Sequence, residues 1–382
     1  MNAALRGLEA HSQRRSLVEV AGVNLCSNDY LGLAASAELR AAVVEAVERA
    51  SRVGGTGSRL LSGHSAVWDA VEEEFAEFLG VEAALYFGSG YTANVGLLSA
   101  VMSEDDLVFS DESNHASLID GIRLSGARKV IYPHLDLNFL ERALREYAAD
   151  GGRKFIVTET VFSMDGDVTP VSELVALAER FGAEVILDEA HATAVHGAGG
   201  RGIGASAGVS DRIFASTHTC GKALASAGAF VCGAAGLREY LINHARTFIF
   251  STAMPPYMAG QISAALRMSM RMDEERAALL ARSRELAANF RARGWRTGDG
   301  ASQIVPVIVG ENEEAVAAAE FLLGQGFAVR AIRPPTVREG TARLRFSVTC
   351  GIAASELARL EVCMESWRAE RNTRTHAFAE RA

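Results

Sequence analysis

The sequence predicts an α/β protein, with a mainly parallel sheet in a large domain and a smaller α+β domain after it. The first observation is that short apolar runs alternate with helical stretches over the first two thirds of the chain. Strands in such an arrangement are covered by helices on both faces of the sheet. The second observation is a long helical stretch rich in Ala, Arg and Glu at residues 258–294. The third is that only two strands and two helices are predicted beyond it, which indicates a smaller unit.

Helical segments come first, before any strand is predicted. Residues 35–50 have helical periodicity and consist of good helix formers. The segment 54–58, Gly-Gly-Thr-Gly-Ser, interrupts this pattern. Residues 66–79 then resume it as an acidic amphipathic helix.

The short apolar runs are the predicted strands. In the large domain they are residues 83–87, 107–109, 129–132, 155–158, 184–187 and 212–215. In the smaller domain, strands are predicted at 304–309 and 343–348, and helices at 312–326 and 354–370. A charged tail, expected to be frayed, begins at Arg371. These limits predict an N-terminal segment 1–31, a large cofactor-binding domain 32–257 and a C-terminal domain 258–382.

Composition and charge exclude several classes of protein. The chain has 382 residues, 49% apolar and 22% charged, which is typical of a soluble globular protein with two or three domains. The net charge of −9 argues against a nucleic-acid partner, because such proteins usually carry a basic face. No apolar run reaches the ~18 residues of a membrane span, and segment 1–20 lacks the apolar region of a secretory signal. Five cysteines without a Cys-x-x-Cys pair predict reduced thiols and a cytoplasmic protein.

Lys222 is the most informative candidate for chemistry. It follows Ser-Thr-His-Thr-Cys-Gly and precedes a run of small residues at 223–228, whereas a surface lysine usually has charged neighbours. Upstream, the predicted strand 184–187 runs directly into Asp188, and His191 follows three residues later. Pyridoxal phosphate needs a lysine amine for an imine, an acid at its pyridine nitrogen and a packed face. The sequence therefore predicts a Schiff-base cofactor site.

Further signals follow predicted strands, where ligands of parallel sheets bind. The glycine turn Gly88-Ser89-Gly90-Tyr91 opens a helix and offers backbone N–H groups to a phosphate. His115 follows the next strand, where a neutral imidazole can stack on an aromatic ring. Glu159 and Ser163 lie just past another strand, and the Thr219 hydroxyl can bond a phosphate. Each signal alone also fits an ordinary loop, and it is their joint order along the chain that indicates the cofactor.

Two other kinds of site fit parts of the same pattern. The run Asp188-Glu189-Ala190-His191 also occurs in one class of helicases, which require a phosphate loop Gly-x-x-x-x-Gly-Lys-Ser/Thr. Around the nearby Gly-Lys pair, Ser216 occupies the position of the first glycine and Ala223 that of the hydroxyl residue. His218 and Cys220 suggest a metal, but zinc takes three or four ligands and no further pair has suitable spacing. We therefore expect neither a helicase nor a metal site.

The chain resembles the α-oxoamine synthases, which are pyridoxal-phosphate enzymes of aminotransferase fold type I. The resemblance extends from residue 27 to about residue 349. It implies a mainly parallel seven-stranded sheet in the large domain and a homodimer with shared active sites. Besides the Asp-Glu-Ala-His run, its motifs are Ser27-Asn28-Asp29-Tyr30-Leu31-Gly32-Leu33, Asn114-His115-Ala116-Ser117, Phe162-Ser163-Met164-Asp165-Gly166-Asp167, Gly221-Lys222-Ala223 and Ser251-Thr252-Ala253-Met254-Pro255-Pro256.

The resemblance implies the roles of the cofactor residues. Lys222 is implied to form the imine with the cofactor and to remove the substrate α-proton. Asp188 is implied to bind the pyridine nitrogen, His191 the ring oxygen, and His115 to stack on the ring. The other implied residues are Gly90, Tyr91 and Thr219 for the phosphate, Thr252 for the phosphate of the neighbouring subunit, and Glu159 and Ser163 as orienting groups.

Substrate residues are implied by the segment 331–345. Arg345 is implied to hold the carboxylate of the amino acid, with Arg333 assisting and Asn28 opposite. A guanidinium fork fits a carboxylate geometrically. This segment matches the members that condense L-alanine with pimeloyl-CoA or a pimeloyl carrier protein during biotin synthesis.

Other readings of the substrates and of the class stay open. Residues 114–121 also suit members that use glycine, for example with acetyl-CoA. Arg14 and Arg15 are the candidates for the distal carboxylate of the acyl chain, and residues 225–227 (Ala-Ser-Ala) replace glycines that many relatives carry. A regulator built on the same fold would carry an N-terminal DNA-binding region. About thirty residues precede the Asn28 motif and they are not notably basic, which disfavours a regulator.

Overall fold

The structure is a computed structural model that describes residues 1–379. Contacts divide the chain into two compact units. The larger unit comprises Leu31–Phe162 and Val168–Arg276, and the smaller comprises Met1–Tyr30, Ser163–Asp167 and Ala277–Ala382. The division at residues 31 and 257 expected from the sequence stays a prediction.

The larger unit is built on a seven-stranded sheet with the order β2-β8-β7-β6-β5-β3-β4. β8 is antiparallel to both of its neighbours, and every other adjacent pair is parallel. The mainly parallel seven-stranded sheet is thus confirmed. The strands are β2 (Ala83–Phe87), β3 (Leu107–Asp111), β4 (Arg128–Tyr132), β5 (Lys154–Glu159), β6 (Ala183–Asp188), β7 (Ala215–Thr219) and β8 (Ala229–Gly233).

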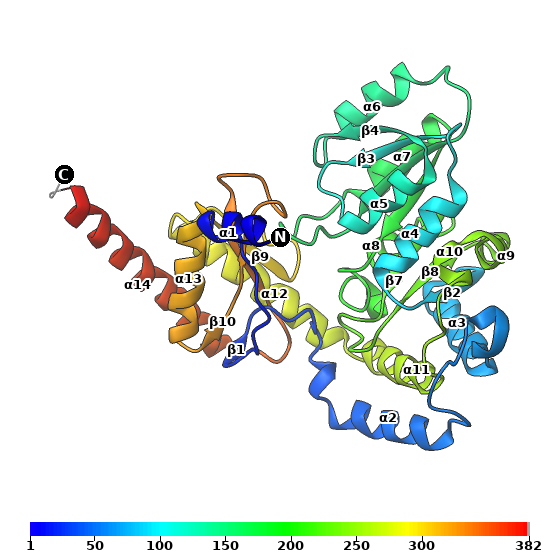
Figure 1. Cartoon of the computed structure of the whole chain (residues 1–382), viewed down its shortest axis with the longest axis horizontal. Coiled ribbons are helices and arrows are strands. Elements are labelled where there is room, and N and C mark those ends of the chain that lie inside the picture. Colours follow the sequence, from blue (N-terminus) through cyan, green and yellow to red (C-terminus); the bar gives the residue numbers. More distant parts are fainter. Residues whose placement is uncertain (380–382) are drawn as a thin grey trace. The chain divides into compact units, whose positions relative to one another are not determined.

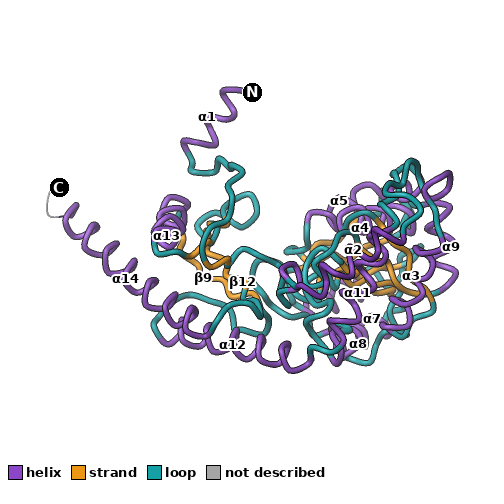
Figure 2. The backbone as a smooth tube through the Cα atoms, turned by 90° about the horizontal axis from the view of Figure 1, so that it is seen from below, coloured by secondary structure: helices purple, strands orange, loops and turns teal. Residues whose placement is uncertain are grey.

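Helices cover both faces of this sheet, and Figure 2 shows the strands of the larger unit between them. The helices are α2 (Ala37–Arg49), α3 (Ala66–Leu79), α4 (Gly90–Val101), α5 (Ala116–Ser125), α6 (Leu137–Glu146), α7 (Val171–Arg180), α8 (Ile203–Ser206), α9 (Ala235–His244), α10 (Arg246–Ile249) and α11 (Tyr257–Met270), with short turns at Leu33–Ala35, Arg59–Gly63 and Ala198–Gly200.

Buried side chains alternate between the two faces of the sheet and form two apolar cores. Val108 and Ile186 pack in one cluster with residues of α4, α5, α9 and α10. Phe109 and Leu187 pack in the other with residues of α6 and α7. Because neighbouring residues of a strand face opposite sides, the central strands β3, β5 and β6 supply both cores. Most of the predicted strands therefore lie where their apolar runs indicated, within one or two residues.

One predicted strand is wrong. Residues 212–215 were expected to form it, but β7 begins at Ala215 and continues through Ser-Thr-His-Thr. All five residues of β7 are buried, including the ring of His218. His218 satisfies its two nitrogens with the hydroxyls of Ser216 at 2.9 Å and Thr193 at 3.0 Å. A central strand of polar residues is stable because its side chains bond one another, and this pairing leaves no apolar signal in the sequence.

The smaller unit contains a three-stranded antiparallel sheet with the order β11-β12-β9. A separate two-stranded parallel sheet joins β1 to β10. The predicted helical stretch 258–294 is two helices, α11 and α12, because the chain turns at Arg271–Met272. Figure 1 labels most of the elements, which are α1 (Asn2–Ala10), β1 (Val23–Asn24), α12 (Asp273–Ala292), β9 (Ile304–Gly310), α13 (Asn312–Gly324), β10 (Phe327–Ala328), β11 (Ala331–Ile332), β12 (Ala342–Ser347) and α14 (Ala354–Ala379).

None of the helices within residues 1–379 combines the length and the hydrophobicity that a bilayer crossing requires. The helix α14 continues past Arg371, where a frayed tail was expected, and its backbone is helical to Ala379. Residues 380–382 of that tail lie outside the described residues.

Candidate active site

The cofactor candidates of the larger unit lie at one edge of its sheet. Glu159 is the last residue of β5, Asp188 the last of β6 and Thr219 the last of β7. Because these strands are parallel, their carboxyl ends meet at the same edge. His115 opens α5 after β3, which is parallel to β5. These candidates, which are far apart in the sequence, therefore lie together at one edge of the sheet.

Gly90 and Thr219 form the part of this edge that suits a phosphate. Gly90 is the first residue of α4, and the Ser89 hydroxyl caps the helix by accepting from the Thr92 N–H at 3.1 Å. The first amides of a helix have no acceptor within it and attract anions. A Cβ atom at position 90 would lie 3.0 Å from the Thr219 Cγ2, so the two segments are in contact. The Thr219 hydroxyl oxygen is buried and has no hydrogen-bond partner among the described residues.

Asp188 is a buried carboxylate with two donors on it. Its side chain is 5% exposed. One oxygen accepts from the Ala190 N–H at 2.8 Å, and the other accepts from the Asn94 amide at 2.6 Å. These donors fix the orientation of the carboxylate. A carboxylate held in this way can accept a further hydrogen bond, for example from a protonated pyridine nitrogen.

His115 caps α5 with its own ring. The N–H of Ser117 donates to the His115 Nδ1 at 3.2 Å. His115 is an exposed residue, yet partial burial of its ring lowers its pKa, with the Lys222 charge lowering it further and the Asp188 charge opposing both. His115 therefore lies within electrostatic range of both Asp188 and Lys222. This places the three residues in one neighbourhood.

Lys222 differs from the other lysines of the chain, which are Lys129 and Lys154. Lys129 is exposed on β4. Lys154 begins β5 and donates to the Asp150 carbonyl at 3.1 Å. Both belong to the amino-terminal half of a strand, whereas Lys222 is half-buried and follows the carboxyl end of β7. It is the one lysine of the chain next to the residues described above.

Three further cofactor candidates lie in the same unit. His191 is buried in the turn after β6. Tyr91 is exposed in the first turn of α4, and its hydroxyl donates to Asp120. Thr252 is exposed, in a segment anchored by the Ala253 N–H, which donates to the Gly57 carbonyl at 2.8 Å.

The substrate candidates Arg345 and Asn28 are brought together with the cofactor candidate Ser163 within the smaller unit. Both terminal nitrogens of Arg345 lie 3.3 Å from the Asn28 Oδ1, and its Nε donates to the Ser163 carbonyl. Ser347 and Tyr30 accept further bonds at 2.7 and 3.4 Å. Ser163, which was predicted beside the cofactor, thus contacts Arg345 through its backbone.

Arg333 does not share these partners. Its guanidinium donates to the Ser12 carbonyl of the N-terminal segment. Burial lowers the pKa of Arg333, and the charge of Arg15 lowers it further. Arg15 itself donates to the Thr336 hydroxyl at 3.0 Å, whereas Arg14 pairs with Glu9. Arg15, and not Arg14, therefore joins Arg333.

The residues at the sheet edge fit pyridoxal phosphate. Thr219 has a buried hydroxyl in need of a partner, and it touches a helix N-terminus that attracts anions. Asp188 has a fixed carboxylate for the pyridine nitrogen. Lys222 supplies an amine and His115 an exposed ring. These groups match the phosphate, nitrogen, aldehyde and ring face of the cofactor.

Two buried residues of this edge were missed by reasoning from the sequence. Asn94 contacts Asp188 and Ser117, and the Ser117 hydroxyl contacts His115. Both are polar residues inside helices, α4 and α5, where a polar residue usually faces solvent. The one available signal was that Asn94 is surrounded by apolar and small residues.

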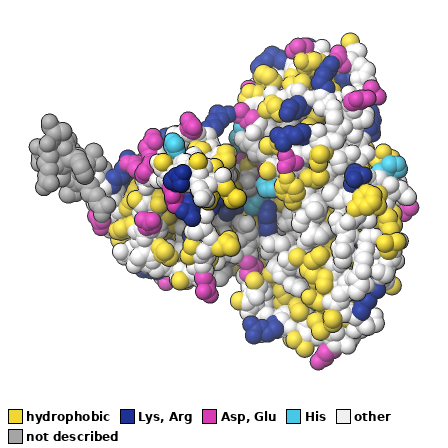
Figure 3. Space-filling model, in the orientation of Figure 1, with side chains coloured by type: hydrophobic (Ala, Val, Ile, Leu, Met, Phe, Trp, Pro, Cys, Tyr) yellow, Lys and Arg dark blue, Asp and Glu magenta, His cyan; other side chains and the backbone are white. Residues whose placement is uncertain are grey.

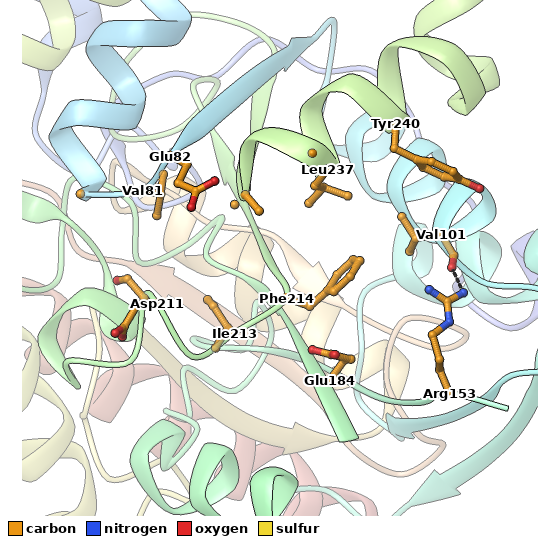
Figure 4. A pocket seen from close by; sticks show the side chains of 15 residues that line it. Val81, Glu82, Val101, Arg153, Glu184, Asp211, Ile213, Phe214, Leu237 and Tyr240 are labelled. Atoms are coloured by element: carbon orange, nitrogen blue, oxygen red, sulfur yellow. Dashed lines mark hydrogen bonds between the residues drawn. The ribbon is translucent and has the colours of Figure 1, made fainter. Parts of the chain in front are cut away.

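A separate cavity of about 620 Å³ lies elsewhere in the larger unit (Figure 4). Phe214 and Leu237 point into it, and Arg153 lies at one side with its guanidinium bonded to the Val101 carbonyl. Its lining includes Glu184, near the amino end of β6, so it belongs to the opposite edge of the sheet. None of the candidate site residues lines it.

Comparison with known proteins agrees with the fold. Residues 20–361 match the family Aminotransferase class I and II. The chain is 47% identical over 347 residues to 8-amino-7-oxononanoate synthase of Geobacter sulfurreducens, covering 90% of this chain and 88% of the relative. It is 45% identical over 347 residues to the enzyme of that name from Aromatoleum aromaticum, covering 91% and 89%.

Solved structures give the same result. Serine palmitoyltransferase of Sphingomonas wittichii superposes with a TM-score of 0.87 at 30% identity, covering 92% of this chain and 88% of that one. The 8-amino-7-oxononanoate synthase of Francisella tularensis superposes with a TM-score of 0.78 at 29% identity, covering 92% and 99%. The chain therefore belongs to the aminotransferase class I and II family and, within it, to the α-oxoamine synthases.

Proposed function

We propose that this protein is a pyridoxal-phosphate-dependent acyltransferase that condenses L-alanine with a pimeloyl thioester, giving 8-amino-7-oxononanoate, CO2 and the free thiol. The product is an intermediate of biotin synthesis. The observation that carries the proposal is the convergence of Lys222, Asp188 and His115 at the carboxyl edge of the sheet. The relatives named 8-amino-7-oxononanoate synthase support the choice of substrates.

Each residue at the sheet edge has one task in this reaction. When bound, the cofactor supplies an aldehyde that condenses with amines and a ring that stabilises negative charge at the substrate α-carbon. Asp188 would accept a hydrogen bond from the pyridine N–H of the cofactor and so keep that nitrogen protonated. The N–H groups of Gly90 and Tyr91 and the Thr219 hydroxyl bind the phosphate. The ring of His115 stacks on the cofactor face, and His191 binds the ring oxygen.

Lys222 moves the proton. Its amine takes the α-proton of L-alanine, and the carbon that loses this proton attacks the thioester carbonyl. The C–S bond breaks, and the thiol leaves. The product then loses its carboxylate as CO2, and one proton returns to the same carbon. Holding both substrates in line supplies several of the ~7–11 kcal/mol that positioning can contribute to a rate.

Arg345 binds the carboxylate of the amino acid. Asn28, Tyr30 and Ser347 hold its guanidinium plane. A planar guanidinium in fixed orientation offers two parallel N–H groups to a carboxylate. Arg333, with Arg15 beside it, is proposed to serve the carboxylates of the substrates as well. The like charges of this pair favour an anion near them.

We infer that the protein works as a homodimer with shared active sites. Leu61 is 83% exposed and Phe250 is 71% exposed. The Ala253 N–H donates to the Gly57 carbonyl and holds the two segments that carry these side chains together. Exposed apolar surface of this kind marks an interface. Figure 3 shows hydrophobic side chains at the surface of the larger unit where Figure 1 places α2 and α11.

The dimer proposal has a matched test. Leu61→Glu places a charge on the proposed interface, and Leu124→Glu places one on a leucine that is 66% exposed on α5. Light scattering after size exclusion is expected to give a monomer for the first variant and a dimer for the second. A dimer for both variants would contradict this interface. Thr252, exposed in the same segment, is proposed to reach the phosphate of the partner.

The five cysteines are free, which supports the proposed cytoplasmic location.

The substrates are tested by a panel. L-Alanine and glycine are each incubated with pimeloyl, acetyl, succinyl and palmitoyl thioesters, and release of the thiol is followed. The proposal predicts the fastest release with L-alanine and the pimeloyl donor. Release only with glycine and the acetyl donor would instead indicate a glycine acetyltransferase.

A further inference from the structure

Four side chains of the larger unit form one continuous hydrogen-bonded chain. Asn94 on α4 donates from its Nδ2 to the Asp188 Oδ2 at 2.6 Å and to the Ser117 Oγ at 2.9 Å. The Ser117 Oγ lies 2.8 Å from the Nδ1 of His115. Asn94 and Ser117 are 2% and 1% exposed. These hydrogen bonds link the His115 ring, which is proposed to stack on the cofactor, to the Asp188 carboxylate, which is proposed to bind the pyridine nitrogen of the cofactor.

The donors and acceptors of this chain have one consistent direction. As a carboxylate, Asp188 only accepts, so Asn94 faces it with its amino group and not with its oxygen. The backbone N–H of Ser117 donates to the His115 Nδ1, so that nitrogen is an acceptor. The Ser117 Oγ accepts from Asn94 and donates its own proton to the same Nδ1. His115 is then neutral and carries its proton on Nε2.

We infer that Asn94 and Ser117 are positioning residues, which hold His115 as the neutral tautomer protonated on Nε2 and orient the carboxylate of Asp188. The inference rests on the proposed roles of His115 and Asp188. A neutral imidazole can stack on a ring whose nitrogen is protonated without repelling it. Asn94 keeps one Asp188 oxygen bonded, so the carboxylate cannot rotate away from that nitrogen.

The charged groups around His115 agree with a neutral ring. Partial burial and the Lys222 charge lower the pKa of His115, and the Asp188 charge is the one that opposes them. Tyr91 packs edge-on against the ring, with 6.5 Å between the ring centroids. Its hydroxyl is bonded to Asp120 and is not directed at the imidazole nitrogens.

Close packing of α4 and α5 brings Asn94 to Ser117. A Cβ atom at position 121 would lie 3.0 Å from both the Asn94 carbonyl oxygen and the Leu98 Cβ. Glycine at this point of α5 lets the two helices approach closely, because a Cβ atom would push against both neighbours. The amide oxygen Oδ1 of Asn94 is buried and has no hydrogen-bond partner among the described residues. Both hydrogens on the Asn94 Nδ2 are thus used while its Oδ1 has no partner among the described residues, as expected if the role of Asn94 is to donate hydrogen bonds.

Nitrogen NMR of protein labelled with nitrogen-15 at histidine reads the tautomer and the pKa of His115. The spectra are recorded without cofactor and after loading with pyridoxal phosphate, and His115→Gln assigns the signals. We expect an unprotonated Nδ1 in the native protein. Ser117→Ala removes one of the two donors to Nδ1 and keeps the backbone N–H. The population of the Nδ1-protonated form and the pKa of His115 are therefore both expected to rise. Ser117→Thr keeps a hydroxyl and is expected to restore the native spectrum.

Two further variants complete the test. Asn94→Ala releases the Ser117 hydroxyl and one Asp188 oxygen, so it is expected to mix the tautomers and to raise the Kd for pyridoxal phosphate roughly tenfold. Ser99→Ala is the control, because Ser99 lies on the same helix and its hydroxyl donates to the Val95 carbonyl at 2.5 Å. Its spectrum and Kd are expected to be native.

The outcomes are distinguishable. Native tautomer, pKa and Kd in both Ser117→Ala and Asn94→Ala would overturn the inference and leave the proposed function intact. Failure of the native protein to bind pyridoxal phosphate would overturn the proposed function. In that case the spectra of the cofactor-free proteins would still decide whether Asn94 and Ser117 set the tautomer of His115.

Discussion

Gly90 and Thr219 touch across the carboxyl edge of the sheet, so that a Cβ atom at position 90 would lie 3.0 Å from the Thr219 Cγ2. Gly90 opens α4 and Thr219 ends β7. The contact brings a helix N-terminus and a buried hydroxyl to the same place, which is the arrangement a phosphate group needs. The size of residue 90 and the hydroxyl of residue 219 are therefore expected to control cofactor affinity.

Gly90→Ala is expected to weaken pyridoxal phosphate binding roughly tenfold, because the added methyl displaces Thr219 from the phosphate. Isothermal titration of the cofactor-free protein measures the Kd. Gly236→Ala is the control, because Gly236 is also in the first turn of a helix and an added Cβ there meets nothing within 4 Å. Equal Kd values for the two variants would show that the contact does not shape the site.

Thr219→Val is expected to raise the Kd for pyridoxal phosphate roughly 10- to 100-fold, since it removes one hydrogen bond to a charged group. Thr217→Val has the same change of shape two residues earlier in β7. The Thr217 hydroxyl is buried without a partner among the described residues, so its removal is expected to stabilise the fold by about 1 kcal/mol. Native affinity in Thr219→Val, measured by the same titration, would contradict a phosphate at Thr219.

Arg345→Lys is expected to raise the KM for L-alanine about 100-fold, with a smaller change in kcat, because an ammonium group cannot present two parallel donors. Steady-state rates over a range of alanine concentrations measure both constants. Arg343→Lys is the control, because Arg343 is equally buried on β12 and pairs with Asp165. A rise in KM for Arg343→Lys and none for Arg345→Lys would show that Arg345 does not bind the carboxylate of L-alanine.

His218 is expected to make the fold less stable in acid. Burial lowers the pKa of His218 to about 3, while its pKa in the unfolded chain is near the ordinary value of 6.5. Between these values the unfolded chain binds one more proton than the folded protein. The stability from neutral His218 is therefore complete above pH 6.5 and is lost as pH falls toward 3, at roughly 1.4 kcal/mol per pH unit.

Urea unfolding at a series of pH values, at constant protein concentration, measures this slope. His218→Gln keeps polar atoms for Ser216 and Thr193 but does not titrate, so its slope is expected to be smaller by one proton. His244→Gln, at an exposed position of α9, is the control and keeps the native slope. Identical slopes for His218→Gln and the native protein would mean that His218 is not held neutral.

Reasoning from the sequence was most successful where apolar residues mark the core. The strand at residues 83–87 was predicted with the bounds that β2 has. The runs ending before Glu159 and Asp188 were predicted as strands, because each is a short apolar run at the centre of a covered sheet. β8 was missed, since it follows a run of small residues and is antiparallel in an otherwise parallel series.

Functional polar residues were predictable only when a motif named them. Lys222, Asp188 and His115 follow strands, where loop residues carry chemistry. Asn94 lies inside a helix, and nothing in its spacing distinguishes it from an ordinary helical polar residue. Ser117 stands in the Asn114–Ser117 motif, but the motif implied no role for it. Their burial depends on the approach of α4 to α5 at Gly121, which is a tertiary contact. The partners of Arg345 are likewise up to 317 residues away in the chain, beyond the reach of any local pattern.

The most direct test of the central claim uses the small number of lysines, which are Lys129, Lys154 and Lys222. Borohydride reduces the C=N bond between a lysine amine and the cofactor aldehyde to a stable single bond. Mass spectrometry of the digested protein then shows which lysine carries the cofactor. The account predicts the label on Lys222 alone, and no label in Lys222→Arg. A label on Lys129 or Lys154 in the native protein, or no label on any lysine after loading, would contradict it.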